Sequence, residues 1–242
     1  MTDRERFLAA ICAEPAEDLH RLVYADWLED QGESDRAAFI RVQVELAPWE
    51  SKSSSFEPPH LPALRRRERQ LLKAHFGEWT DPLPEELVTK PCESCLEQSP
   101  DWETNAVECR RCDSTGLVLD EDRVEFRRGF VEELAPPAAL WIEHGDAILK
   151  ANPIREVRLA TWPEVVVQTY ERERCTVLTL TAGARQTSFY VEHRLIHHIG
   201  PDREGVFYRD IIYRLLKQLW PTVSFVLPEE RPENVRVESS SS

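Results

Sequence analysis

Glycine is scarce in this chain, with 8 positions among 242 residues. Phosphate-cradling loops depend on glycine, and the sequence contains neither a P-loop nor a Gly-x-Gly-x-x-Gly fingerprint. A Gly-x-Ser-x-Gly nucleophile elbow is also missing. The sequence therefore offers no motif for nucleotide-dependent catalysis or for an α/β-hydrolase, although a catalytic triad can be scattered through a chain without any motif.

Long apolar runs are missing as well. No segment approaches the roughly 20 apolar residues that a membrane-spanning helix needs. The N-terminus is charged from Asp3 onward, unlike a secretory signal. We therefore expect a cytoplasmic protein without a membrane partner.

Positive charge is in deficit, with 30 Lys and Arg against 44 Asp and Glu and a net charge of −14. Such a surface opposes phosphate binding as a whole. Two local exceptions are basic: the run Arg65, Arg66, Arg67 and Arg69, and the pair Arg110 and Arg111. The first run is typical of a solvated helix face and, alternatively, of a surface for an anionic partner.

Four of the 6 cysteines form two Cys-x-x-Cys pairs, Cys92 with Cys95 and Cys109 with Cys112. This spacing predicts a zinc ribbon with tetrahedral thiolate coordination. Four protein ligands leave no open position for water or substrate, so the predicted zinc is structural. Two disulfides and a redox dithiol are the alternatives, and disulfides require an oxidising compartment.

Two other groups are weaker site candidates. Arg110 and Arg111 lie inside the second cysteine pair and are candidates for contact with nucleic acid or another anion. His193 and His197 are four residues apart, so on a helix they would share a face as a metal-binding pair. The His-Glu-x-x-His order is missing, because Arg194 stands where the glutamate is expected.

The first 47 residues predict three short helices. Thr2 and Glu5 have the spacing of a capping box, and Gly32 is placed to end the second helix. Ser34 can cap the third helix. The apolar face of the second helix is expected to consist of Leu19, Leu22, Val23 and Trp27. Asp26 on that helix is expected to face solvent or to pair with an arginine such as Arg41.

Part of this helical region is familiar. Residues 22–32, with the core Tyr-Ala-Asp-Trp-Leu, and residues 36–43 resemble the short repeat-companion domain that is abundant in planctomycete proteins. Segments 128–133 and 151–159 resemble, more weakly, segments that precede leucine-rich repeats in that family. The resemblance implies a bacterial module of a kind that often accompanies leucine-rich repeats, and it supplies no enzymatic role. No Leu-x-x-Leu-x-Leu array follows Leu159.

The remaining patterns predict an α+β protein: an N-terminal helical unit, the zinc ribbon, and a small mixed β-sheet with a covering helix. Helices are expected at 62–76, 137–150 and 207–220, and strands at 117–119, 124–126, 157–159, 165–167, 177–180, 189–191 and 222–227. The expected divisions are 1–47, 60–90, 91–119, 120–228 and a disordered tail at 229–242.

From these features we expect a non-catalytic interaction or adaptor protein with a structural zinc and a protein partner. A zinc-ribbon protein that binds nucleic acid is the second hypothesis. A metal-dependent hydrolase that uses His193 and His197 is the third. We do not expect an enzyme. Salt-dependent binding to DNA or RNA tests the second hypothesis, and metal analysis of a variant without the four cysteines tests the third.

Overall fold

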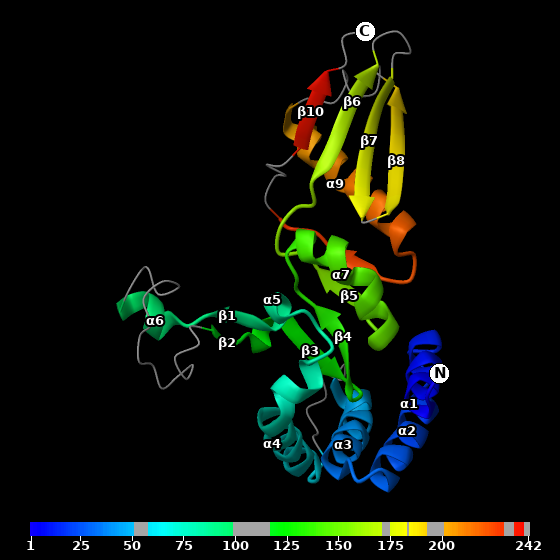
Figure 1. Cartoon of the computed structure of the whole chain (residues 1–242), viewed down its shortest axis with the longest axis vertical. Helices are drawn as coiled ribbons and strands as arrows, with labels where there is room; N and C mark the ends of the chain where they lie inside the picture. Colours follow the sequence, from blue (N-terminus) through cyan, green and yellow to red (C-terminus); the bar gives the residue numbers. More distant parts are fainter. Residues whose placement is uncertain are drawn as a thin grey trace. The chain divides into compact units, whose positions relative to one another are not determined.

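A computed structural model describes residues 1–50, 58–98, 117–170, 175–182, 184–192, 201–229 and 235–239. The chain is mixed α+β, as the sequence predicted (Figure 1). It divides into two compact units. One comprises Met1–Glu132 with Ile148–Pro153, and the other comprises Glu133–Ala147 with Ile154–Ser242. No helix in the described ranges is both long and apolar enough to cross a membrane.

The first unit begins with four helices: α1 (Asp3–Ala13), α2 (Asp18–Asp30), α3 (Ser34–Glu50) and α4 (Leu61–Thr80). The capping box is confirmed: the Glu5 N–H donates to Thr2 Oγ1 at 3.2 Å, and the Thr2 N–H donates to Glu5 Oε2 at 2.7 Å. These bonds satisfy two backbone donors that a helix start leaves unpaired.

The end of α2 is also as predicted. Gly32 has φ +86°, and its N–H donates to the Glu29 carbonyl at 3.0 Å. The Glu33 N–H donates to the Leu28 carbonyl at 2.9 Å. This pair of bonds is a Schellman motif, which needs a left-handed residue at the position that Gly32 occupies.

The buried face of α2 differs from the prediction. Leu19, Leu22 and Val23 are exposed, by 60%, 36% and 45%. The buried residues of this helix are Arg21, Tyr24, Ala25 and Leu28. The helix is therefore rotated relative to the expected apolar face, because Arg21 is buried with a partner elsewhere in the chain.

The helices α3 and α4 both run past the predicted ends. Helix α3 continues through Pro48 to Glu50, beyond the predicted boundary at residue 47, and α4 continues through Gly77 to Thr80. The Thr80 hydroxyl donates to the Phe76 carbonyl at 2.8 Å within the last turn. Within α4, His75 Nδ1 lies 2.9 Å from Glu78 Oε2, and this hydrogen bond raises the pKa of His75.

Short elements complete the first unit: α5 (Glu85–Val88), β1 (Thr89–Pro91), α6 (Glu93–Gln98), β2 (Leu117–Leu119), a 3₁₀ turn η1 (Glu121–Arg123), β3 (Val124–Arg127) and the start of β4 (Phe130–Leu134). Strands β3 and β4 are neighbours joined by Arg128 and Gly129, which have φ of +51° and +88°. Positive φ at both residues is what a two-residue type I′ hairpin turn requires.

The second unit contains the end of β4 together with α7 (Ala138–Ala151), β5 (Glu156–Arg158), β6 (Val165–Tyr170), β7 (Cys175–Ala182), β8 (Arg185–Glu192), α9 (Pro201–Leu219), β9 (Ser224–Val226) and β10 (Val235–Ser239). The sequence predicted one small sheet here. The strands instead divide between two sheets, with β4, β5 and β9 adjacent in one and the order β10-β6-β7-β8 in the other.

The helix α9 covers one face of the β10-β6-β7-β8 sheet (Figure 1). Strands β6, β7 and β8 form an antiparallel meander, and β10 lies parallel to β6 with Val235 opposite Val165. This strand falls within residues 229–242, for which disorder was predicted. The separate aromatic cluster of Trp141, Trp220 and Phe225 is buried at 0%, 2% and 6% exposure.

Candidate metal centre

A short antiparallel ladder forms the base of the cysteine segment. Strands β1 and β2 pair so that Pro91 lies opposite Leu117. Lys90 Nζ lies 3.1 Å from a carboxylate oxygen of Asp120, next to the ladder. The chain therefore departs from this ladder at Cys92 and returns to the partner strand directly across from its point of departure.

The first cysteine pair is part of a tight turn at the end of β1. The Cys95 N–H donates to the Cys92 carbonyl at 2.9 Å, and Cys95 lies in the first turn of α6. The side chains of Cys92 and Cys95 are 0% and 2% exposed, and Val118 of β2 packs against them. The turn expected for a Cys-x-x-Cys knuckle is therefore present at this pair.

The other predicted ligands fall outside the described residues. Cys109 and Cys112, and the arginines Arg110 and Arg111 between them, lie in 99–116. Within the described parts of the chain, no group of three or more His, Cys, Asp or Glu side chains is arranged to hold a metal ion. The four-cysteine zinc site and the arginine contact both remain predictions.

His193 and His197 lie in 193–200, which is likewise outside the described residues. Of the two remaining cysteines, Cys175 lies in β7. Cys12 is half-buried on α1, and burial raises the pKa of its thiol, an effect that Arg21 partly opposes. A thiol with a raised pKa is less often a thiolate, so Cys12 is poorly suited to metal binding or nucleophilic chemistry.

A buried ion cluster was not anticipated from the sequence. Arg21 of α2 and Glu132 of β4 are both 0% exposed, and Arg21 Nη2 lies 2.7 Å from Glu132 Oε1. Arg128 Nη2 lies 2.9 Å from the other Glu132 oxygen, and Asp18 lies 3.5 Å from Arg128 Nη1. Burial lowers the pKa of Arg21, and the charge of Glu132 opposes that shift.

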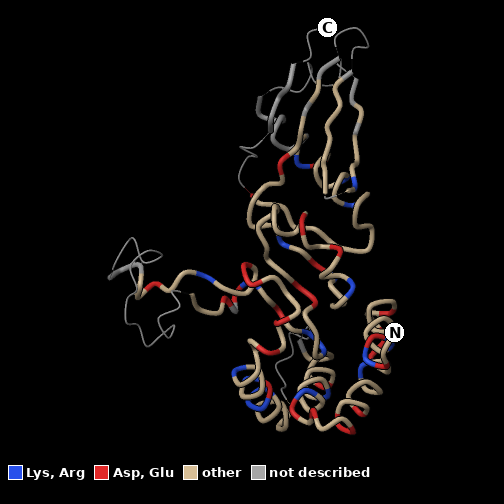
Figure 2. Tube along the Cα trace, viewed as in Figure 1, with Lys and Arg blue, Asp and Glu red and all other residues tan. Residues whose placement is uncertain are grey.

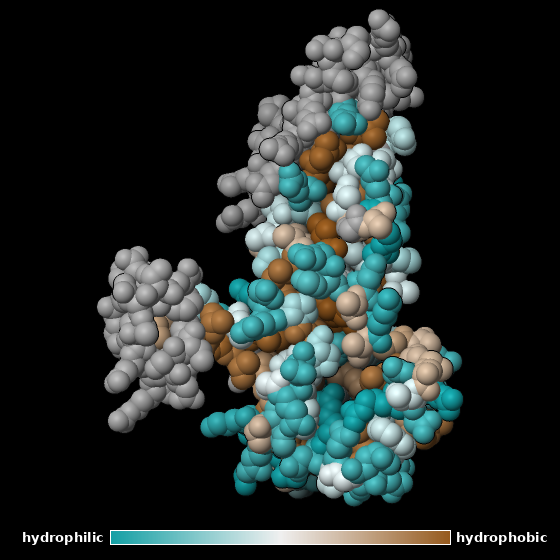
Figure 3. Space-filling view, viewed as in Figure 1, coloured by the Kyte–Doolittle hydropathy of each residue, from teal (hydrophilic) through white to brown (hydrophobic). Residues whose placement is uncertain are grey.

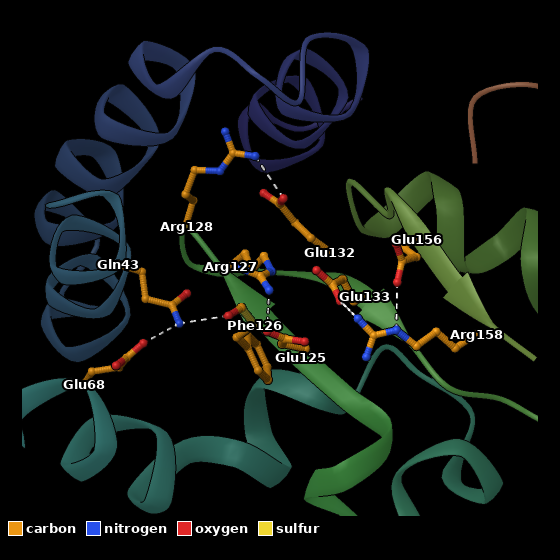
Figure 4. Close-up of polar contacts among 10 residues, drawn as sticks. All are labelled: Gln43, Glu68, Glu125, Phe126, Arg127, Arg128, Glu132, Glu133, Glu156 and Arg158. Atoms are coloured by element: carbon orange, nitrogen blue, oxygen red, sulfur yellow. Dashed lines mark hydrogen bonds and ion pairs between the residues drawn. The ribbon is translucent and has the colours of Figure 1, made fainter. Parts of the chain in front are cut away.

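A second polar contact joins α3 to the β3–β4 hairpin. The Gly129 N–H donates to Gln43 Oε1 at 2.7 Å. Gln43 Nε2 donates to the Phe126 carbonyl at 3.0 Å and to Glu68 Oε1 at 2.8 Å (Figure 4). Gln43 is 2% exposed. One buried amide therefore satisfies backbone groups on both sides of the hairpin turn, which is the role expected of a buried polar side chain.

A third feature is an arginine surrounded by aromatic rings. The Arg36 guanidinium carbon lies 4.7 Å from the Trp79 ring centroid and 5.5 Å from that of Phe130. Its buried Nη1 has no hydrogen-bond partner among the described residues. Burial lowers the pKa of Arg36 to about 10. Cation–π contact is the compensation available to such a cation, and no hydrophobic pattern in the sequence indicates it.

The expectation for Asp26 is confirmed. Arg41 Nη2 lies 2.7 Å from Asp26 Oδ1, and Arg41 Nη1 lies 2.6 Å from Glu29 Oε2. Asp26 is exposed, and Trp27 packs at the edge of the helical core. The residues of the Tyr-Ala-Asp-Trp-Leu segment therefore either pack in the helical core or, as Asp26 does, pair with Arg41 at the surface.

These arrangements hold the unit together, and none of them is a constellation for acid–base or nucleophilic chemistry. Comparison of the chain with protein-family models, with curated proteins and with solved structures gives no match.

Proposed function

We propose that this chain is a non-catalytic interaction protein in which Cys92, Cys95, Cys109 and Cys112 hold one structural zinc ion. The observation that carries the proposal is the burial of Cys92 and Cys95 directly after the β1–β2 ladder. Two buried cysteines that share a tight turn and one hydrophobic cluster are suited to bind the same metal ion.

Chain connectivity favours the second pair as the missing half of the site. Cys112 precedes Leu117 by five residues, and Leu117 is opposite Pro91 in the ladder. Five residues span at most about 17 Å when fully extended, so Cys112 is tethered close to the first pair. Structural zinc contributes on the order of 10 kcal/mol, which is ample to order a segment of this length.

The non-catalytic part of the proposal rests on coordination chemistry and on composition. Four thiolates fill the coordination sphere of zinc, so no water can be activated there. No catalytic motif is present in the sequence, and the resemblance of the first fifth of the chain to repeat-companion domains supports an accessory role. An interaction role is the simplest one for a protein whose metal site has no open position and whose sequence contains no catalytic motif.

Metal analysis tests the proposal. The full chain, purified without added metal, is expected to contain one zinc per chain. Cys92→Ser and Cys109→Ser are each expected to lose it, and Cys12→Ser is the matched control that keeps it. Replacing zinc with cobalt is expected to produce the absorption bands of thiolate-coordinated cobalt.

Three outcomes contradict the proposal. Protein without zinc that shows disulfides under non-reducing conditions favours the disulfide alternative. Zinc content unchanged by Cys92→Ser and Cys109→Ser places the metal elsewhere. A metal that survives removal of all four cysteines and is lost with His193 and His197 supports the hydrolase hypothesis instead.

A further inference from the structure

The helix α4 presents a basic face whose cations make no ion pair within the described parts of the chain. Arg66, Arg69 and Lys73 are exposed and recur at i, i+3 and i+7, so they line one side of the helix. Hydrophilic residues cover α4 in the view of Figure 3, and Lys and Arg positions recur along it in Figure 2. We call Arg66, Arg69 and Lys73 the basic stripe.

The flank of α4 toward α3 is different. Arg67 Nη2 lies 3.2 Å from Asp35 Oδ1, and His75 Nε2 lies 3.2 Å from Asp35 Oδ2. The three residues of the basic stripe make no ion pair with any described residue. Arg67 and His75 are therefore paired with a carboxylate of α3, whereas the basic stripe faces solvent and is accessible to a partner.

The size of the stripe limits the kind of anion that it suits. From Arg66 to Lys73 the helix rises about 10 Å, at about 1.5 Å per residue. The chain as a whole carries a net charge of −14, and charges are screened over about 8 Å at physiological ionic strength. An anion that stays within the stripe is attracted, whereas one that extends well beyond it is opposed by the net negative charge of the chain.

Duplex nucleic acid extends too far, because it carries about one charge per 1.7 Å over its whole length. An acidic helix fits, since carboxylates at i, i+3 and i+7 repeat with the spacing of the stripe. Two of the three cations are arginines, whose planar guanidinium groups bind carboxylates in a bidentate manner. We infer that the basic stripe of α4 is a docking surface for an acidic helical segment of a partner protein.

This inference names a partner class for the proposed interaction role and rests on that role, but it does not involve the cysteines. The probe is a labelled, alanine-based helical peptide with glutamates at i, i+3 and i+7, and its glutamine counterpart is the uncharged control. Binding to the full chain is measured by fluorescence anisotropy at low and physiological salt. The zinc content of the same protein samples is measured in parallel.

The test variant is Arg66→Glu/Arg69→Glu/Lys73→Glu. The matched control, Arg6→Glu/Lys150→Glu/Arg155→Glu, has the same net charge but keeps the stripe. The glutamate peptide is expected to lose at least about tenfold in affinity for the test variant and less than about threefold for the control, since three exposed ion pairs together contribute about that much. Far-UV circular dichroism checks that both variants fold.

Equal losses in the two triple variants would show that net charge alone drives binding and would overturn the inference. Tighter binding of a single-stranded DNA 20-mer than of the peptide, lost in the test variant, would replace it with a nucleic-acid surface. Failure of the glutamate peptide to bind at low salt overturns it directly. Zinc content unaltered in these samples keeps the metal proposal independent of all three results.

Discussion

The sharpest test of the helical unit is a pair of glycine substitutions, Gly129→Ala and Gly32→Ala. The two glycines have nearly the same backbone conformation, with φ of +88° and +86°. Their surroundings differ: a Cβ on Gly129 would lie 2.8 Å from Ile40 Cα and 2.9 Å from Ile40 Cβ, whereas a Cβ on Gly32 meets nothing within 4 Å. The pair therefore separates backbone strain from steric overlap.

The magnitudes follow from these geometries. An alanine in the left-handed region costs about 1–2 kcal/mol, which is the whole expected loss for Gly32→Ala. Gly129→Ala adds overlap with Ile40, which is 0% exposed and contributes backbone as well as side-chain atoms to the clash. Overpacking of a closed core costs about 1–3 kcal/mol more, so the total is about 2–5 kcal/mol.

Urea unfolding, followed by tryptophan fluorescence and far-UV circular dichroism, measures both losses. The difference between the two variants is expected to be about 1–3 kcal/mol, with Gly129→Ala the less stable. Equal losses would refute the close packing of the hairpin turn against α3. A loss of stability in Gly32→Ala alone would refute both the strain and the overlap expected at Gly129.

Arg21→Met leaves the Glu132 carboxylate buried without its α2 partner, so thermal unfolding is expected to show a loss of about 3–5 kcal/mol. Arg21→Met/Glu132→Leu is expected to recover most of that loss; a double variant less stable than the single one contradicts this account. Arg41→Ala removes only exposed ion pairs, so its urea-unfolding free energy should fall by about 1 kcal/mol or less, and a loss several times larger would be inconsistent with a surface role. The carboxylates beside His75 raise its pKa, so its stabilisation is fully present below the ordinary value of 6.5 and is lost as pH rises through the raised value. In a pH series of urea midpoints, His75→Gln should remove this dependence, and identical slopes for the two proteins would count against it.

Local signals predicted the start of α1 and the end of α2. Thr2 and Glu5 form the expected capping box, and Gly32 ends α2 in the expected left-handed conformation. Helix α7 and strand β2 also occur where the patterns placed them, whereas strand β1 was not predicted. Each of these features depends on residues within a few positions of one another, and a sequence displays such relations directly.

Non-local compensation explains the main error in the helical unit. Counting apolar positions assigns Leu19, Leu22 and Val23 to the buried face of α2 and leaves Arg21 on its solvent-facing side. Arg21 is buried because Glu132, which lies far along the chain, supplies the opposite charge at 2.7 Å. A pattern read within one helix carries no information about such a partner, since each charge alone would be too costly to bury.

The candidate site was predictable only as far as its chemistry is local. Binding of one metal ion by both thiols of a Cys-x-x-Cys pair needs a tight turn, and such a turn is present at Cys92 and Cys95 with both side chains buried. The role of Gln43 at the hairpin, by contrast, has no signal in the sequence, because an amide in a helix is usually a solvated residue. Its three hydrogen bonds arise only when α3, α4 and the hairpin meet.

The contacts of the hairpin change what counts as the helical unit. Phe130 belongs to the same buried cluster as Tyr24 and Leu28 of α2. The Arg21 guanidinium carbon lies 5.8 Å from the centroid of the Phe130 ring, and Glu132 neutralises Arg21. The first 47 residues therefore do not contain the whole core of the helical unit. Without the hairpin, the charge of Arg21 would lack its buried partner among the apolar side chains of this unit. The helix and the hairpin strand therefore depend on each other, because a buried arginine on α2 requires a buried carboxylate on β4.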